Sequence, residues 1–155
     1  MNMTTLITAY KTALNNDTAL AAWCTTNFSA VQDVRVSIDK RDPATLAAPL
    51  IILAPHSELD AADGMTYTIA ASCGLQDEGL LATGLAKVTE LQGVSHLDTF
   101  RNTVKATMKA ATLDAGYYFG DISTDYEAVD YFPNFVAVML FPVHYKARKM
   151  RGRYS

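Results

Sequence analysis

Hydrophobic residues recur at helical spacing near the start of the chain. The members of the first stripe lie three and four residues apart and so share one helical face: Leu6, Ile7, Tyr10, Ala13 and Leu14. Asp17 is suited to cap a second, short helix over residues 18–24, which would turn Leu20 and Trp23 toward the core. The N-terminal part of the chain is therefore expected to be helical.

A longer helical pattern follows in the second half of the chain. Ser95 and Asp98 have the spacing of a capping box, with Asp98 in place of the usual Glu or Gln. The apolar stripe that follows has helical spacing and consists of Leu97, Phe100, Val104, Met108 and Ala111. We expect a helix from His96 to about Leu113, with Gly116 as the left-handed residue beyond its end.

Alternating and continuous apolar runs predict the first strands. Residues 34–38 and 65–73 alternate apolar with small or polar side chains, which is the period of a half-buried strand. Residues 49–55 are nearly all apolar and are bracketed by prolines, which favours a central strand. A turn-rich acidic loop is expected after this strand, as far as Gly64.

The remaining segments complete an α+β fold. Residues 122–130 and 135–145 are expected to form a C-terminal β-hairpin, whereas residues 75–93, with three glycines, fit an edge strand or an irregular excursion. Because the connections are too tight for parallel crossovers throughout, we expect a largely antiparallel β-sheet with two main helices packed on one face. The expected core consists of Ile51, Leu53, Tyr67, Ile69, Val136, Val138 and Leu140 below Phe100, Val104 and Met108.

Charge divides the chain into two unlike parts. Residues 1–145 carry eight Lys or Arg against sixteen Asp or Glu, and residues 146–155 carry five basic residues and no acid. We expect a single domain over residues 1–145 and a basic C-terminal tail, whose cations are Lys146, Arg148, Lys149, Arg151 and Arg153. This division favours docking between copies of the chain, because opposite potentials steer and orient association. A solvated terminus and contact with nucleic-acid phosphates are the alternatives.

An acidic cluster precedes the expected final strand. Asp121, Asp125 and Glu127 would share one strand face, where they could bind a divalent ion, take part in acid–base chemistry or be solvated. We interpret them as a solvated acidic strand and, with the basic tail, as candidate interaction residues.

The sequence carries no recognisable catalytic motif. It lacks Gly-x-Ser-x-Gly, a phosphate loop, a dinucleotide fingerprint and His-Glu-x-x-His. Cys24 and Cys73 are isolated in apolar company and are interpreted as buried free thiols, although a disulfide stays open. His56, His96 and His144 are scattered, so we expect no metal site, no cofactor and no catalytic residue. A nucleophile and base made of Cys24 and His144 would require the fold to join them.

Composition, the length of the longest apolar run and the first residues bear on where the protein is located in the cell. Half of the residues are hydrophobic and 19% are charged, which is typical of a folded domain. The longest apolar run, residues 135–143, is far shorter than the ~20 residues of a membrane helix, so we expect no membrane partner. The first residues lack the pattern of a signal peptide, which predicts synthesis in the cytoplasm.

Several local sequence features together resemble those of one protein family. They are the helix that leads into residues 17–23, the Pro49-Leu-Ile-Ile-Leu strand, the helix from His96 and the closing run of residues 135–145. In order and length these resemble the tail terminator, or tail-completion, proteins of long-tailed bacteriophages, with neck and minor tail proteins close behind. Residues 75–93 depart from that pattern and look like an insertion.

The resemblance implies a structural role in a virion, at the junction of tail and head. Such a protein forms a homo-hexameric ring that caps the tail tube, stops its polymerisation and meets the head–tail connector or stopper protein, with passing contact to DNA. A ring needs two unlike patches on each subunit, which an acidic body and a basic tail supply. Another neck or minor tail protein, a small nucleic-acid-binding module that uses the basic tail and a small enzyme are the alternatives.

Overall fold

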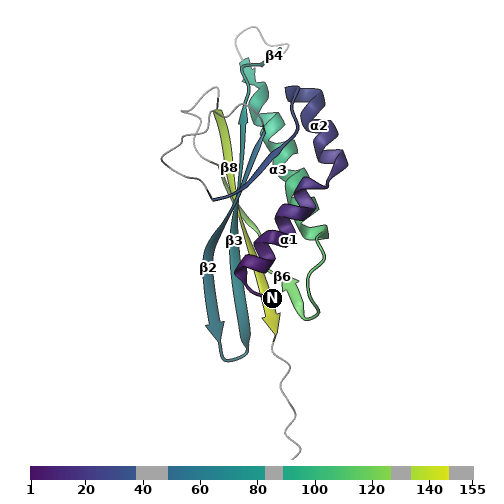
Figure 1. The fold of residues 1–155 in the computed structure, drawn as a ribbon. Helices are drawn as coiled ribbons and strands as arrows, with labels where there is room; N and C mark the ends of the chain where they lie inside the picture. The colour runs from purple at the N-terminus through teal and green to yellow at the C-terminus, as the bar shows by residue number, and fades with distance from the viewer. Residues whose placement is uncertain (38–48, 83–88, 127–133, 147–155) are drawn as a thin grey trace, which may run out of the picture.

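The molecule is built on one long β-sheet with its helices along a single face (Figure 1). The computed structural model describes residues 1–37, 49–82, 89–126 and 134–146. Within these ranges the elements are α1 (Met3–Asn15), α2 (Thr18–Phe28), β1 (Asp33–Val36), β2 (Leu50–Ala61), β3 (Gly64–Gln76), β4 (Leu80–Ala82), β5 (Thr89–Leu91), α3 (Gln92–Ala110), β6 (Tyr117–Phe119), β7 (Ser123–Tyr126) and β8 (Asn134–Lys146).

β8 is the strand around which the sheet is organised. The strand order is β1-β2-β3-β8-β6, and β7 also pairs with β8. β8 pairs with β3 along its whole length on one side and with β6 and β7 on the other. β1 and β2 are parallel, and every other pair in this sheet is antiparallel. The expected α+β class, a largely antiparallel sheet with helices on one face, is confirmed.

The N-terminal helices begin at side chains that accept hydrogen bonds from the first helical turn. The side-chain carbonyl of Asn2 accepts from the N–H of Thr5 at 2.9 Å, and the Asp17 carboxylate accepts from the N–H of Leu20 at 2.9 Å. α2 ends at Ser29, whose φ of 55° is left-handed. The predicted N-cap at Asp17 is therefore confirmed, and α2 continues four residues beyond the expected end at Cys24.

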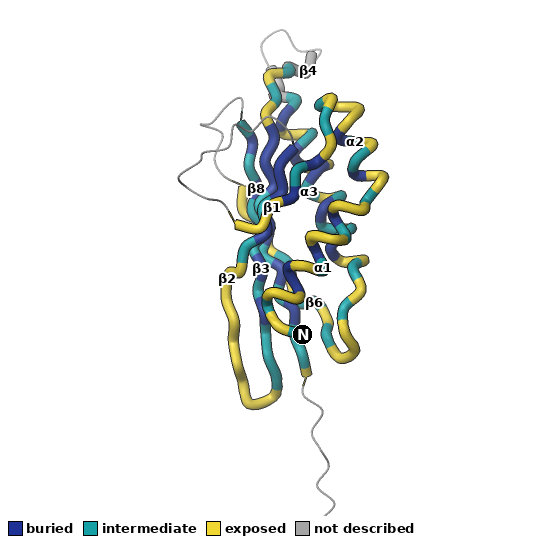
Figure 2. The backbone as a smooth tube through the Cα atoms, in the orientation of Figure 1, coloured by how far each residue is buried: buried dark blue, intermediate teal, exposed yellow. Residues whose placement is uncertain are grey.

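The core lies between the helices and the face of the sheet that they cover, called here the inner face. α1 buries Leu6, Ile7, Tyr10 and Leu14, and α3 buries Leu97, Phe100, Val104 and Met108. The sheet contributes the side chains of alternate residues, and Figure 2 colours the buried positions of β3 and β8 dark blue. Phe100 stacks on Trp23 of α2 with ring centroids 5.8 Å apart, which joins the two helices. The predicted core residues of β2, β3 and α3 are confirmed as buried.

The predicted core residues of β8 are wrong by one position. Val136, Val138 and Leu140 are only half-buried, whereas the buried residues of this strand are Phe135, Ala137, Met139, Phe141 and Val143. Nearly every residue from 135 to 143 is apolar, so the sequence carries no period that fixes which face points to the helices. Pairing decides it, because Met139 lies opposite the buried Ala71, and Leu140 lies opposite Ala70 on the other face.

β2 and β3 form a hairpin that extends beyond the helices. The acidic loop expected after residue 55 is wrong, since β2 continues to Ala61 with a register shift between Pro55 and Ser57. Residues 55–63 are all exposed, and Figure 2 shows this stretch of the hairpin as a continuous yellow tube, whereas the β3 side is not yellow. At the tip, a Cβ on Gly64 would lie 1.9 Å from the carbonyl oxygen of Tyr145, so that only glycine fits there.

Three other boundaries differ from the sequence-based expectation. α3 begins at Gln92, so Ser95 lies inside the helix and does not cap it. The N–H of Gln92 donates to the carbonyl of Gly79 at 3.0 Å, which ties the helix start to a separate two-stranded sheet made of β4 and β5. For residues 75–93 the expectation was an edge strand or an irregular excursion; the structure shows β4 paired with β5 in this small sheet, and residues 83–88 lie outside the described ranges. β6 was not predicted as a strand, and Gly116, with a φ of 92°, lies in the turn before it and not directly after α3.

Candidate interaction surface

The outer face of the sheet, opposite the helices, is apolar along much of its length. No helix in the described part of the chain covers it (Figure 1). Its apolar residues are half-buried and come from β2, β3 and β8: Ile52, Ala54, Ala70, Val136, Val138, Leu140 and Pro142. The chemistry of this face resembles that of a protein interface more than that of an ordinary polar surface.

One row of side chains crosses four strands of the outer face near the hairpin tip. Leu59 pairs with Thr66, Thr66 with His144, and His144 with Tyr118. The Thr66 hydroxyl and Nδ1 of His144 share a hydrogen bond of 2.8 Å, and the Tyr118 ring lies 5.3 Å from the His144 ring. The two outer members are large and exposed, Leu59 at 62% and Tyr118 at 53%.

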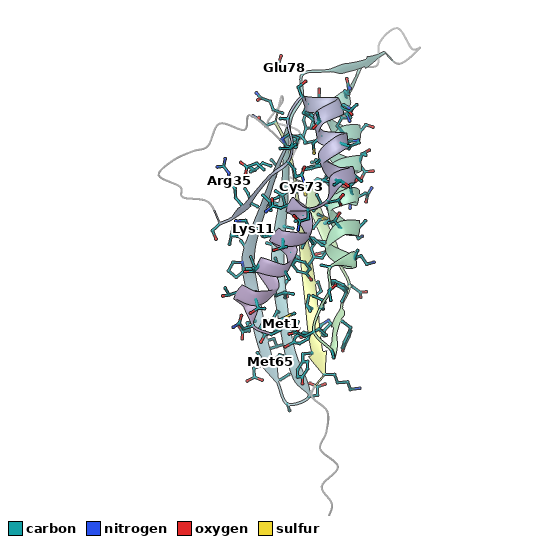
Figure 3. The ribbon with its side chains drawn as sticks, turned by 45° about the vertical axis from the view of Figure 1, so that its right-hand side comes forward. Met1, Lys11, Arg35, Met65, Cys73 and Glu78 are labelled. Atoms are coloured by element: carbon teal, nitrogen blue, oxygen red, sulfur yellow. The ribbon has the colours of Figure 1, made fainter. Side chains whose placement is uncertain are left out.

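This row borders a pocket of about 260 Å³. The hairpin forms one wall, and the ends of β6 and β8 form the other, with Leu59, Asp63, Thr66, Tyr118, His144 and Lys146 among the lining residues. Met65, another lining residue, lies at the end of the molecule opposite Glu78 (Figure 3). The pocket combines the apolar side chains of Leu59 and Tyr118 with polar and charged groups, among them Asp63 and Lys146, which suits an amphipathic chain segment.

The hairpin arm is strongly acidic. Residues 49–82 contain five acids and no Lys or Arg: Glu58, Asp60, Asp63, Asp77 and Glu78. Within the described residues, no ion pair involves Glu58, Asp60 or Asp63. Three exposed carboxylates therefore stand on residues 55–63 and give this part of the hairpin a negative potential, with the cation of Lys146 beside Asp63 in the pocket at the tip.

The structure brings only some of the predicted interaction residues together. Lys146 is the exposed last residue of β8 and lies opposite Gly64 at the hairpin tip. Asp125 of β7 pairs with Val138, eight residues further back along β8, which is about 26 Å away at ~3.3 Å per residue. Asp121 is exposed but precedes β7, so it does not share that strand with Asp125 as expected. The remaining predicted residues lie outside the described ranges: Glu127, Arg148, Lys149, Arg151 and Arg153.

A second polar cluster lies at the opposite end of the molecule. Oδ2 of Asp77 lies 2.6 Å from Nδ1 of His96, and the N–H of Gly79 donates to the other carboxylate oxygen at 2.8 Å. The other ring nitrogen of His96 faces the Gln92 amide at 3.2 Å, not a hydroxyl or thiol. The cluster connects the end of β3 to the first turn of α3, which is a structural use of a histidine–carboxylate pair.

A charged group also joins α3 to β7. The Arg101 guanidinium donates to Asp98 at 2.7 Å and lies 5.6 Å from the centre of the Tyr126 ring. This hydrogen bond is the main reason why the pKa of Asp98 is lowered and that of Arg101 is raised. β7 is thereby fixed to the helix layer as well as to β8.

A solved chain with a similar fold belongs to a virus-like particle. It comes from the structure of the virion of a native gene transfer agent particle, with a TM-score of 0.52 and 16% sequence identity. The likeness covers 91% of this chain and 94% of that chain, so it concerns the whole fold and not a shared fragment. No family model matches the sequence, and no curated protein matches it at a significant level.

The candidate nucleophile and base of the sequence analysis are separated. Cys24 is buried in α2 on the helix side, and His144 lies on the outer face of the sheet. Burial raises the pKa of Cys24 to about 11 and that of Cys73 to about 12, which keeps both thiols protonated at neutral pH. Both cysteines are free.

The described side chains also form no group of three His, Cys, Asp or Glu residues able to hold a metal ion. None of the described helices is long and apolar enough to cross a membrane. Among the described residues, the surface features left as candidates for an interaction are the apolar outer face, the acidic hairpin and the pocket at its tip.

Proposed function

We propose that this chain is a structural subunit of a phage-like virion. The observation that carries the proposal is the fold shared over nearly the full length of both chains with a component of a gene transfer agent virion. The outer face supports a role in assembly, because it is apolar and no described helix covers it. This proposal assigns the chain no catalytic step.

Within the virion, the role that fits best is that of a ring-forming tail terminator. Such a subunit would form a homo-hexamer at the head–tail junction, cap the tail tube and meet the connector or stopper protein. A closed ring joins two different patches of neighbouring copies, and this chain has an acidic arm and a basic C-terminal sequence that differ in sign.

Light scattering and electron microscopy of the purified full chain test this role. At low micromolar concentration, alone or with tail tubes from the same particle, we expect closed rings or particles bound at tube ends. A chain that stays monomeric and ignores the tubes would contradict the terminator role. Salt-sensitive DNA binding by such a monomer would favour the nucleic-acid-binding alternative.

A further inference from the structure

The pocket at the hairpin tip has the shape and chemistry of a docking groove. It lies on the outer face, and the exposed Leu59 and Tyr118 stand on its opposite sides. Together they give an incoming apolar side chain two large surfaces to contact, with the His144 ring between them. Asp63 lines the same pocket, so a cation beside that apolar side chain would find a carboxylate.

The hairpin extends this charge beyond the pocket. Glu58 and Asp60 point to the other side of the arm, because they pair with the inner-face residues Tyr67 and Met65. β1 pairs only with residues 50–53, so β2 from Pro55 onward forms an edge of the sheet among the described strands, and residues 55–63 are exposed. A basic segment that lies across the arm can therefore approach carboxylates on both of its sides.

The chain's own C-terminal sequence has the complementary composition. Residues 146–155 read Lys-Ala-Arg-Lys-Met-Arg-Gly-Arg-Tyr-Ser, in which five cations surround Met150 and Tyr154. β8 delivers this segment to the hairpin tip, since Lys146 lies opposite Gly64. Residues 147–155 can span up to about 30 Å when extended, which is the length available for docking on another copy.

The direction in which β8 runs favours docking of a neighbouring copy's tail over docking of the chain's own tail. β8 runs past the pocket toward the tip, so that His144 precedes the exit point at Lys146 by two residues. The chain's own tail would have to reverse at once to return to Leu59, whereas the tail of a neighbouring copy can arrive without that turn. We infer that the basic tail of one copy docks in the groove of the next, with Met150 or Tyr154 in the pocket and its cations on the acidic arm. This inference rests on the proposed function for the existence of a neighbouring copy.

Cysteine cross-linking between two variants of the full chain tests the inference. One variant carries Ala61→Cys at the pocket, and the other carries Ser155→Cys, which leaves Tyr154 in place. The native thiols do not interfere, because Cys24 and Cys73 are fully buried. The control pairs Ser155→Cys with Ala106→Cys, an equally exposed alanine on α3. We expect the Ala61 pair to cross-link between chains about tenfold faster than the control pair, as proximity raises the effective concentration.

Charge and topology give two further readouts. Adding Asp63→Asn, or raising salt to 1 M where screening acts within about 3 Å, should reduce the cross-linking rate severalfold. Equal rates for the Ala61 and Ala106 pairs would overturn the inference. So would a cross-link that forms only within a single chain carrying both Ala61→Cys and Ser155→Cys, because that result means docking in the same subunit. If the chain forms rings but the cross-link does not form, tail docking is refuted and the terminator role is not. If the cross-link forms but the complexes neither close into rings nor bind tubes, the terminator role is refuted and tail docking is not.

Discussion

Close contact between α3 and β8 depends on a single missing methyl group. Gly93 lies in the first turn of α3, where a Cβ would come within 2.1 Å of the Phe135 ring. Phe135 is buried and begins the core stripe of β8. Glycine therefore serves packing at this position, where its backbone freedom would otherwise weaken a helix.

We expect Gly93→Ala to destabilise the protein by about 1–3 kcal/mol through overpacking, despite a helix-propensity gain of up to ~1 kcal/mol. Urea unfolding measures the change. Phe135→Leu in the same chain should make room, so that adding Gly93→Ala to it costs much less than adding it to the wild type. A Gly93→Ala protein as stable as the wild type would show that the ring moves without cost.

Asp17 joins two helices through one carboxylate. It caps α2 and also accepts a hydrogen bond from the Thr107 hydroxyl of α3. Burial acts to raise the pKa of Asp17, but the hydrogen bonds from Thr107, Leu20 and Ala19 outweigh it and leave the pKa below its usual 3.8. A lowered folded-state pKa means that the carboxylate stabilises the fold above its ordinary pKa and that this contribution disappears as the pH falls through the lowered value.

Asp17→Ala should cost about 1 kcal/mol at neutral pH, because the N-cap is lost. Asp17→Asn keeps a capping side chain and should cost less at neutral pH. The advantage of the wild type over Asp17→Asn should shrink as the pH falls below the ordinary value, which unfolding titrations at several pH values measure. A difference that is constant with pH would mean that the charge on Asp17 contributes nothing.

At the scale of elements, the two faces of β8 lie in different environments. The inner face packs against the helices, and the outer face belongs to the proposed assembly surface. Substitutions at neighbouring positions of this strand should therefore separate folding from assembly.

Met139→Ala should lower the free energy of unfolding by ~2–5 kcal/mol, since its side chain is fully buried. Leu140→Ala, one residue later on the half-buried outer face, should cost clearly less in the monomer. Thermal and urea unfolding of the two variants compare them directly. The reverse order of stabilities would restore the face assignment first drawn from the sequence.

The buried residues of an element could be predicted from the sequence only where its two faces differ in polarity. α1 and α3 have one apolar stripe each, and β3 alternates, so their buried residues could be predicted. Residues 135–143 are apolar on both faces, which hid the phase of β8. Residues 56–61 have no buried face at all, so their acids read as a loop although pairing with β3 makes them a strand.

The candidate surface was predictable only in its charge. Lys146 was singled out as part of a basic segment; it lies at the hairpin tip, and its interaction role stays a prediction. Leu59, Thr66, Tyr118 and His144 come from four strands and meet only through register, which a single sequence does not contain. The one signal that the sequence offered for this surface was the position of the large hydrophobic residues Leu59 and Tyr118, on an expected loop and at an expected strand end.

At the scale of the whole molecule, we expect folding to depend on residues 1–146 and assembly to depend also on residues 147–155. The last fully buried side chain of β8 is Val143, so the fold of the described domain should not depend on residues 147–155. Deleting those residues should leave the melting temperature unchanged and weaken assembly. A full-length control with Gln at positions 148, 149, 151 and 153 separates charge from length.

Sedimentation of the deletion and Gln variants, with and without tail tubes, measures this effect. Both should assemble less well than the wild type at physiological ionic strength, and the wild type should approach them as salt rises, because exposed charge pairs are screened over ~8 Å. Undiminished assembly of the deletion variant would end the tail-docking hypothesis.

The position of β8 at the end of the folded chain also has a consequence for biosynthesis. Before β8 is made, β3 has a partner strand, β2, on one side only, and β6 and β7 have no partner strand. The sheet therefore cannot be completed until residues 134–146 have left the ribosome. Until then β3 presents an open edge, and closure requires contacts between residues about seventy positions apart, which are slow to form. An unfinished copy therefore lacks the completed outer face, and with it the surface proposed for assembly.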